Sequence, residues 1–215
     1  MFYQIGRQSA ADYTLSYLGL RKFIGCLGIA LPFVVLLGKI VFDGSGIEPT
    51  ISDYYYTVMR DVFVGLLCAI GIFLLSYRGY DRSDEIAGDI AGCAAIGVAW
   101  APTTPAVIAG PHDQLLGICH YVFAAVFFAT LAYFCLALFR KTDSPAAMKP
   151  RKKTRNGVYT VCGWVILAFM IAIAVYKFSG TTAFGAFPLV FVLETVMILA
   201  FGISWLIKGE ALLKD

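Results

Sequence analysis

Six long apolar stretches alternate with short polar segments along this chain. Each stretch reaches about 20 residues, the length that an α-helix needs to cross the hydrocarbon core of a bilayer. The pattern therefore predicts an all-α, polytopic membrane protein, in which residues 1–215 form a single six-transmembrane-helix bundle. The predicted helices cover residues 22–42, 56–77, 85–103, 115–139, 157–178 and 187–208.

The basic residues predict the orientation of this bundle. Fourteen of the 17 Lys and Arg residues lie in the N-terminal segment, the loops after the second and fourth stretches, and the C-terminal tail. Loops rich in Lys and Arg stay on the cytoplasmic side of a membrane. We therefore expect both termini to be cytoplasmic, which agrees with an even number of crossings. Residues 8–20 are a candidate interfacial helix before the first crossing.

The composition supports the membrane assignment and argues against a soluble domain and a nucleic-acid-binding protein. The chain is 60% hydrophobic and 14% charged, whereas soluble domains are nearer half apolar and a quarter charged. The basic residues are concentrated in the segments predicted to be cytoplasmic, so they do not indicate nucleic-acid binding. The six cysteines lie inside apolar stretches and lack metal-ligand spacing. We expect them to be free thiols, and we expect neither a metal nor another cofactor.

The third stretch is dominated by small residues. Nine of the 14 residues from 86 to 99 are Gly, Ala or Cys, and Gly88 and Gly92 form a GxxxG motif. Small residues let helix backbones approach closely in lipid, where the hydrophobic effect gives little drive for association. We expect this helix to pack closely against its neighbours and to be central in the bundle.

Polar residues interrupt the apolar stretches on the predicted outer side. Arg60 and Asp61 are adjacent in the second stretch, His120 lies in the fourth and Glu194 in the sixth. Charged groups inside lipid are costly and usually have a function. Glu194 must be protonated, paired or facing an aqueous cavity. Its predicted partner is Arg60, with His120 as the second candidate.

The first predicted outer loop covers residues 43–51 and contains a DGSG turn. Ser52 or Thr57 is a candidate N-cap of the second helix. The three consecutive tyrosines that follow Asp53 are typical of the aromatic belt at a membrane–water interface. Lys39, at the outer end of the first helix, is predicted to extend its ammonium group towards the headgroups.

The order and shared membrane side of these features resemble the six-helix DRAM and Sfk-like family of membrane proteins. The eukaryotic branch of that family includes a factor in the lipid remodelling of GPI anchors, and a bacterial branch is known as a domain of unknown function. The resemblance implies a six-helix, lipid-associated protein, here of a bacterial inner membrane, with membrane lipids as its partners. The outer-loop cysteines of some animal members are absent. The matching features are the sequence PTISD at residues 49–53, Arg60, His120 and Glu194.

The first functional hypothesis is an outward-facing polar pocket that binds or helps to remodel a lipid or other amphiphile. The candidate ligand-binding residues are Ser52, Asp53, Tyr56 and Arg60. Arg60 would hold a phosphate or carboxylate head. The aromatic residues of the fourth helix would line the acyl region.

The second hypothesis is an intramembrane hydrolase or acyltransferase. His120 would be the general base, Asp61 or Glu194 would orient it, and Ser52 would be the hydroxyl nucleophile. The sequence has no GxSxG or HExxH motif, and its two histidines exclude a three-His metal site. A purely structural role is a third possibility, in which Arg60, Asp61, His120 and Glu194 form a buried network that fixes the helix register.

Overall fold

The computed structural model describes residues 16–105, 107, 110–141, 149–181 and 183–213. Within these residues the fold is all-α, with six α-helices, two short helices of other types and no strand. The α-helices are α1 (Tyr17–Asp43), α2 (Arg60–Leu75), α3 (Arg82–Trp100), α4 (Pro111–Tyr133), α5 (Pro150–Ser179) and α6 (Leu189–Lys208). The short helices are the 3-10 helix η2 (Ser52–Tyr56) and the π-helix η3 (Phe134–Leu138), which continues α4.

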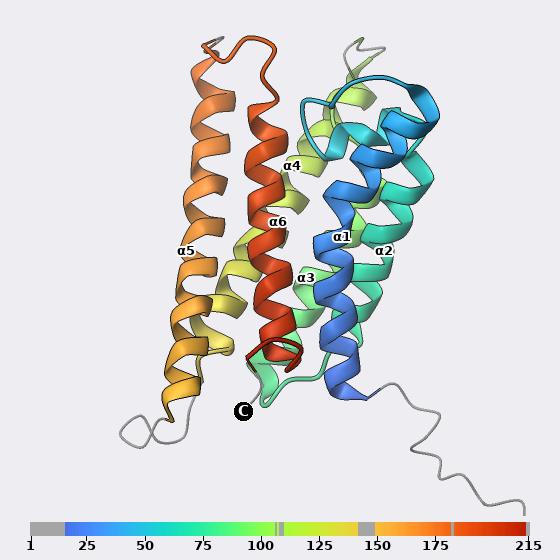
Figure 1. Cartoon of the computed structure of the whole chain (residues 1–215). Coiled ribbons are helices and arrows are strands. Elements are labelled where there is room, and N and C mark those ends of the chain that lie inside the picture. Colours follow the sequence, from blue (N-terminus) through green and yellow to red (C-terminus); the bar gives the residue numbers. More distant parts are fainter. Residues whose placement is uncertain (1–15, 106, 108–109, 142–148, 182, 214–215) are drawn as a thin grey trace, which may run out of the picture.

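The six α-helices form a ring in chain order (Figure 1). Each α-helix packs against the next one, and α6 packs against α1 to close the ring. This arrangement corrects the prediction that the third helix is central, because α3 packs mainly against α2 and α4. Its small residues therefore face two neighbouring helices in the ring, α2 and α4.

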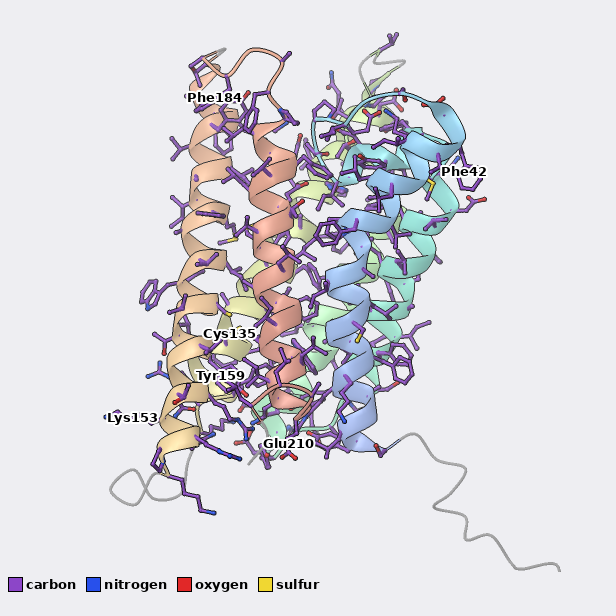
Figure 2. The ribbon with its side chains drawn as sticks, in the orientation of Figure 1. Phe42, Cys135, Lys153, Tyr159, Phe184 and Glu210 are labelled. Atoms are coloured by element: carbon purple, nitrogen blue, oxygen red, sulfur yellow. The ribbon has the colours of Figure 1, made fainter. Side chains whose placement is uncertain are left out.

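The bundle has two distinct ends (Figure 2). One end contains the start of α1, the turn between α2 and α3, the start of α5 and the end of α6, with Lys153 and Glu210 labelled there. We call it the basic end, because most of the described Lys and Arg residues lie on it. The opposite end, which we call the η2 end, contains η2 and the starts of α2, α4 and α6.

Four of these helices are long and apolar enough to cross a membrane. They are Tyr17–Asp43, Pro111–Leu138, Pro150–Ser179 and Leu189–Lys208. The chain thus has the helical character of a membrane protein, as its sequence predicts. The other two helices differ because α2 has only 16 residues and α3 is composed mainly of small residues, with two acids in its first turn. The crossing of the membrane by α2 and α3 stays a prediction.

Several helix ends differ from the predicted ones, because α1 begins five residues earlier, α5 seven residues earlier and α2 four residues later than predicted. Ser52–Tyr56 forms η2, and α2 begins only at Arg60, with Met59 as an N-cap that makes no side-chain bond. Thr57 accepts a hydrogen bond from the Met59 N–H at 3.1 Å, and its hydroxyl donates to the Tyr54 carbonyl at 2.9 Å. Thr57 therefore stabilises the turn between η2 and α2. Most of the candidate interfacial helix at 8–20 lies outside the described residues.

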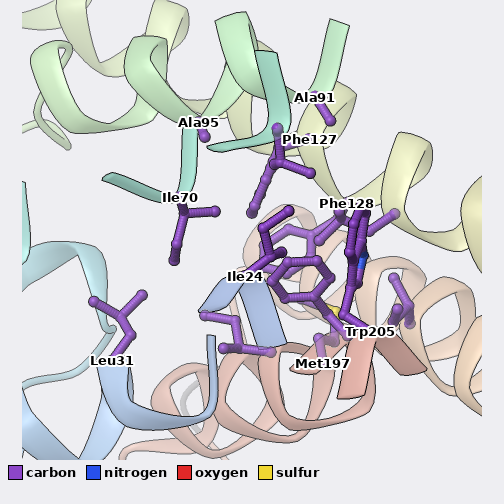
Figure 3. Packing of buried hydrophobic residues seen from close by; sticks show 14 of the residues in the cluster. Ile24, Leu31, Ile70, Ala91, Ala95, Phe127, Phe128, Met197 and Trp205 are labelled. Carbon is purple, nitrogen blue, oxygen red and sulfur yellow. The ribbon is translucent and has the colours of Figure 1, made fainter. Parts of the chain in front are cut away.

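Aromatic side chains fill the core where the helices converge (Figure 3). Trp205 of α6 is fully buried and packs edge-on against Tyr77, Phe134 and Phe139, with ring centroids 5.0–5.3 Å apart. Edge-to-face pairs of this kind add about 0.5–1.5 kcal/mol each beyond the burial of their area. This part of the core is thus built by residues of η3, α6 and the turns after α2 and η3.

The GxxxG motif of α3 lies at its contact with α2, which confirms the prediction of close packing. A Cβ atom at Gly92 would lie 2.7 Å from the carbonyl oxygen of Gly71, and one at Gly88 would lie 2.9 Å from that of Leu74. Real Cβ atoms do not approach so closely. The two backbones are therefore in direct contact, which only glycine permits at these positions.

Candidate functional site

The loop after α1 is fixed to that helix by Lys39. The Lys39 ammonium donates a hydrogen bond to the Gly46 carbonyl at 2.9 Å and forms an ion pair with Glu48. Its side chain is 8% exposed. The prediction of an ammonium group among the lipid headgroups is therefore wrong, because the folded loop supplies both an acceptor and a counter-charge closer at hand.

Glu194 holds the same loop to α6. One of its carboxylate oxygens accepts a hydrogen bond from the Ile51 N–H at 2.7 Å. Nearby, the Phe191 N–H donates to the Pro49 carbonyl at 2.9 Å. The predicted pairing of Glu194 with Arg60 is not found among the ion pairs of the described residues. The partner of Glu194, in the second turn of α6, is a backbone amide.

Glu194 and Ser52 line one cavity in the interior of the bundle. Its volume is about 30 Å³, and its other walls are apolar side chains, among them Leu31, Phe127 and Phe128. A space of this size holds little more than a single water molecule. Sites for organic ligands are about ten times larger. The cavity therefore brings two predicted site residues together without leaving room for a substrate.

Asp53 and Tyr56 attach η2 to the segment that follows α3. The Thr103 hydroxyl donates to the Asp53 carboxylate at 2.8 Å, and the Tyr56 hydroxyl donates to the Thr103 carbonyl. Two predicted ligand-binding residues thus have structural partners.

His120 of α4 contacts the same segment after α3, at Ala101. The imidazole is buried, and its Nδ1 lies 2.6 Å from the Ala101 carbonyl oxygen. Since a carbonyl only accepts, Nδ1 must carry a hydrogen. A neutral ring then keeps Nε2 as its basic nitrogen, as a general base requires. However, His120 lines neither the small interior cavity nor the larger groove described next.

Arg60 and Asp61 line a second, larger cavity at the η2 end. This groove has a volume of about 350 Å³ and is bounded by Tyr55, Arg60, Asp61, Val64, Ala99 and Trp100. The guanidinium of Arg60 donates to the Tyr55 hydroxyl at 2.6 Å and lies 4.3 Å from the centre of that ring. Arg60 is exposed, and Trp100 is 73% exposed. We call this cavity the Arg60 groove.

The predicted site residues therefore separate into groups. Ser52 and Glu194 share the small interior cavity, and Arg60 and Asp61 share the Arg60 groove. The proposed assembly of serine, histidine and acid is not collected in either cavity. Within the described residues, no three His, Cys, Asp or Glu side chains are placed to hold a metal ion.

Sequence reasoning did not include Tyr55, Trp100 or Thr103 among the candidate site residues. Tyr55 was recognisable as one of three tyrosines close to Arg60, and Trp100 as an aromatic residue at a helix exit. Thr103 carried no signal, because its role comes from a carboxylate 50 positions away in the chain. Comparisons of the chain with protein-family models, with curated proteins and with solved structures give no match.

Proposed function

We propose that this chain is a six-crossing membrane protein of a bacterial inner membrane, with both termini cytoplasmic, and that it binds or helps to remodel a lipid or other amphiphile. The four apolar helices support membrane residence. The ring packing supports two further crossings, since α2 and α3 complete the same bundle. At about 1.5 Å per residue, α3 is roughly 28 Å long, close to the thickness of the hydrocarbon core.

The Arg60 groove is the observation that carries the binding proposal. Its volume of about 350 Å³ lies within the range of small-molecule sites, about 300–1,000 Å³. The groove combines an exposed guanidinium with the aromatic rings of Tyr55 and Trp100. A guanidinium suits a phosphate or carboxylate head, and aromatic rings favour the headgroup level of a membrane. Together these groups suit an amphiphile with an anionic head.

Of the aromatic residues of the fourth predicted helix, Phe127, Phe128 and Phe134 are buried in the core, whereas Tyr121 and Phe123 are exposed. Val64, Ala99 and Trp100 are the apolar residues that line the Arg60 groove. We place the acyl chains along this outer surface of α2 and α3. Membership of the DRAM and Sfk-like family is part of the same proposal.

The test compares lipid bound to wild type with lipid bound to Arg60→Ala. Both proteins are purified in a mild detergent, and retained lipid is measured by native mass spectrometry and by extraction. We expect wild type to retain a defined lipid, and Arg60→Ala to retain at least about tenfold less. That factor corresponds to the roughly 1.5–3 kcal/mol of one charge-assisted hydrogen bond.

Lys177→Ala is the matched control. Lys177 is exposed at the end of α5 and also belongs to the η2 end, but it does not line the Arg60 groove. Its replacement removes one positive charge from the same membrane side. Equal lipid retention in wild type and Arg60→Ala would refute the groove as a binding site. If Lys177→Ala lost as much bound lipid as Arg60→Ala, the loss would come from surface charge and not from the Arg60 groove.

A further inference from the structure

The Arg60 groove holds two opposite charges. Arg60 and Asp61 both line it, and both side chains are exposed. Neither residue belongs to an ion pair of the described residues. Lys39 and Glu48, which lie at the same end of the bundle, pair with each other instead. The groove therefore offers a cation and an anion that the folded protein leaves without a counter-charge.

The start of α2 keeps these two charges apart. α2 begins at Arg60, so Asp61 lies in its first turn. Successive residues of an α-helix point about 100° apart, and adjacent side chains do not face each other. The Arg60 guanidinium also lies 4.3 Å from the centre of the Tyr55 ring, which fixes its direction. The helix thus presents both charges to the groove without letting them neutralise each other.

Arg60 keeps donors for a ligand. A guanidinium has five N–H donors. Among the described residues, the Tyr55 hydroxyl accepts one hydrogen bond from Arg60 Nη2 at 2.6 Å. The other donors of this exposed group are open to a phosphate, whose oxygens match the planar fork of an arginine.

Asp61 and Trp100 suit a cation. A carboxylate attracts an ammonium group and accepts its N–H donors. The face of an indole attracts cations more strongly than other aromatic rings do. Trp100 ends α3 and is 73% exposed, so its ring is accessible to a ligand in the groove. A head with only negative charge would leave both groups unused and would be repelled by Asp61.

We propose that the Arg60 groove selects a lipid with a zwitterionic head, in which a primary ammonium accompanies the phosphate. Arg60 binds the phosphate, and Asp61 together with Trp100 binds the ammonium. Phosphatidylethanolamine has this chemistry. The inference rests on the proposed function, because it names the head that the same groove prefers. It also gives Asp61 a role, which an anionic group alone does not.

The test uses the full-length protein in a mild detergent, with three probes that carry the same acyl chains. They are phosphatidylethanolamine, its N-acetylated derivative, which keeps the phosphate but loses the ammonium charge, and diacylglycerol, which has no charged head. Native mass spectrometry gives the Kd of each probe for wild type, Arg60→Ala, Asp61→Asn and Asp43→Asn. Asp43 is the matched control, because it is an exposed acid at the end of α1 that does not line the groove.

We expect wild type and Asp43→Asn to bind phosphatidylethanolamine about fivefold more tightly than the N-acetylated lipid, the effect of one well-placed exposed ion pair. Asp61→Asn is expected to bind the two phospholipids equally. Arg60→Ala is expected to bind both at least about tenfold more weakly than wild type does. Asp61 also favours the start of α2 through the helix dipole. Loss of that effect lowers Tm, but it does not change the ratio of the two affinities.

The outcomes separate this inference from the proposed function. If wild type binds both phospholipids equally and Arg60→Ala loses both, the groove binds a phosphate but the zwitterionic preference is refuted. A preference that persists in Asp61→Asn, or that Asp43→Asn loses to the same extent, refutes it as well. If wild type binds neither phospholipid more tightly than diacylglycerol, the proposed function fails and this inference fails with it. The comparison of the probes on wild type needs no variant to fold.

Discussion

Replacing Glu194 with alanine is expected to lower the free energy of unfolding by about 1–3 kcal/mol, the cost of leaving a buried donor without an acceptor. The Glu194 carboxylate accepts the Ile51 N–H at 2.7 Å, and Ile51 is 3% exposed. The substitution also removes a contact between α6 and the loop that leads into η2. The measurement is thermal unfolding of the purified protein in detergent.

Glu194→Gln is the matched variant for this prediction. Glutamine keeps the side-chain length and one carbonyl oxygen, so it can still accept the Ile51 N–H. It removes the ionisable carboxyl group. We expect Glu194→Gln to remain within about 1 kcal/mol of wild type, a difference comparable to one ordinary hydrogen bond. Equal loss of stability in both variants would show that the charge of Glu194, rather than its acceptor, stabilises the fold.

Replacing Gly202 with leucine is expected to cost about 3 kcal/mol, the upper part of the usual range for overpacking a core. Gly202 of α6 lies against Gly25 of α1. A Cβ atom at either position would lie 2.8 Å from the carbonyl oxygen of the other. Neither carbonyl can move away without moving its helix. The leucine must therefore separate α1 from α6 and open the ring. Thermal unfolding measures the loss of stability, and electrophoretic mobility in detergent measures the loss of compactness.

Gly157→Leu is the control for this effect. Gly157 also lies inside an α-helix, but a Cβ atom there would have no neighbour within 4 Å. Leucine has a higher helix propensity than glycine by roughly 0.5–1 kcal/mol. We therefore expect Gly157→Leu to leave Tm unchanged or to raise it. A loss of stability as large as that of Gly202→Leu would mean that the α1–α6 contact is not the cause.

The number and order of the helices were predictable because apolar length, Pro and Gly positions and basic loops all indicate the same six stretches. The prediction was less accurate at η2. Its residues, SDYYY, follow a good capping pattern, yet they form a separate 3-10 helix that docks on residues after α3. Nothing in the local sequence distinguishes this segment from the first turn of α2. The contact between Gly25 and Gly202 could not be predicted either, because it joins residues near the two ends of the chain.

The candidate site was predictable in part. The sequence identified Arg60 and Asp61, which line one groove, and Ser52 and Glu194, which line one cavity. It could not identify the partner of Glu194, because a backbone N–H has no sequence signature. It also treated the basic residues as signals of topology. The burial of Arg21, Arg155 and Lys208 depends on how α1, α5 and α6 pack, which the sequence does not reveal.

The central claim of this account is a bundle with six crossings and its Arg60 groove on the outer side. The most direct measurement is labelling of single introduced cysteines in intact cells with a membrane-impermeant thiol reagent. The native cysteines lie within helices, and wild type gives the background. We predict that Ile47→Cys is labelled, whereas Arg82→Cys and Lys153→Cys are labelled only after the membrane is opened. Labelling of Arg82→Cys together with Ile47→Cys in intact cells would contradict the claim, because α2 and α3 would then not cross.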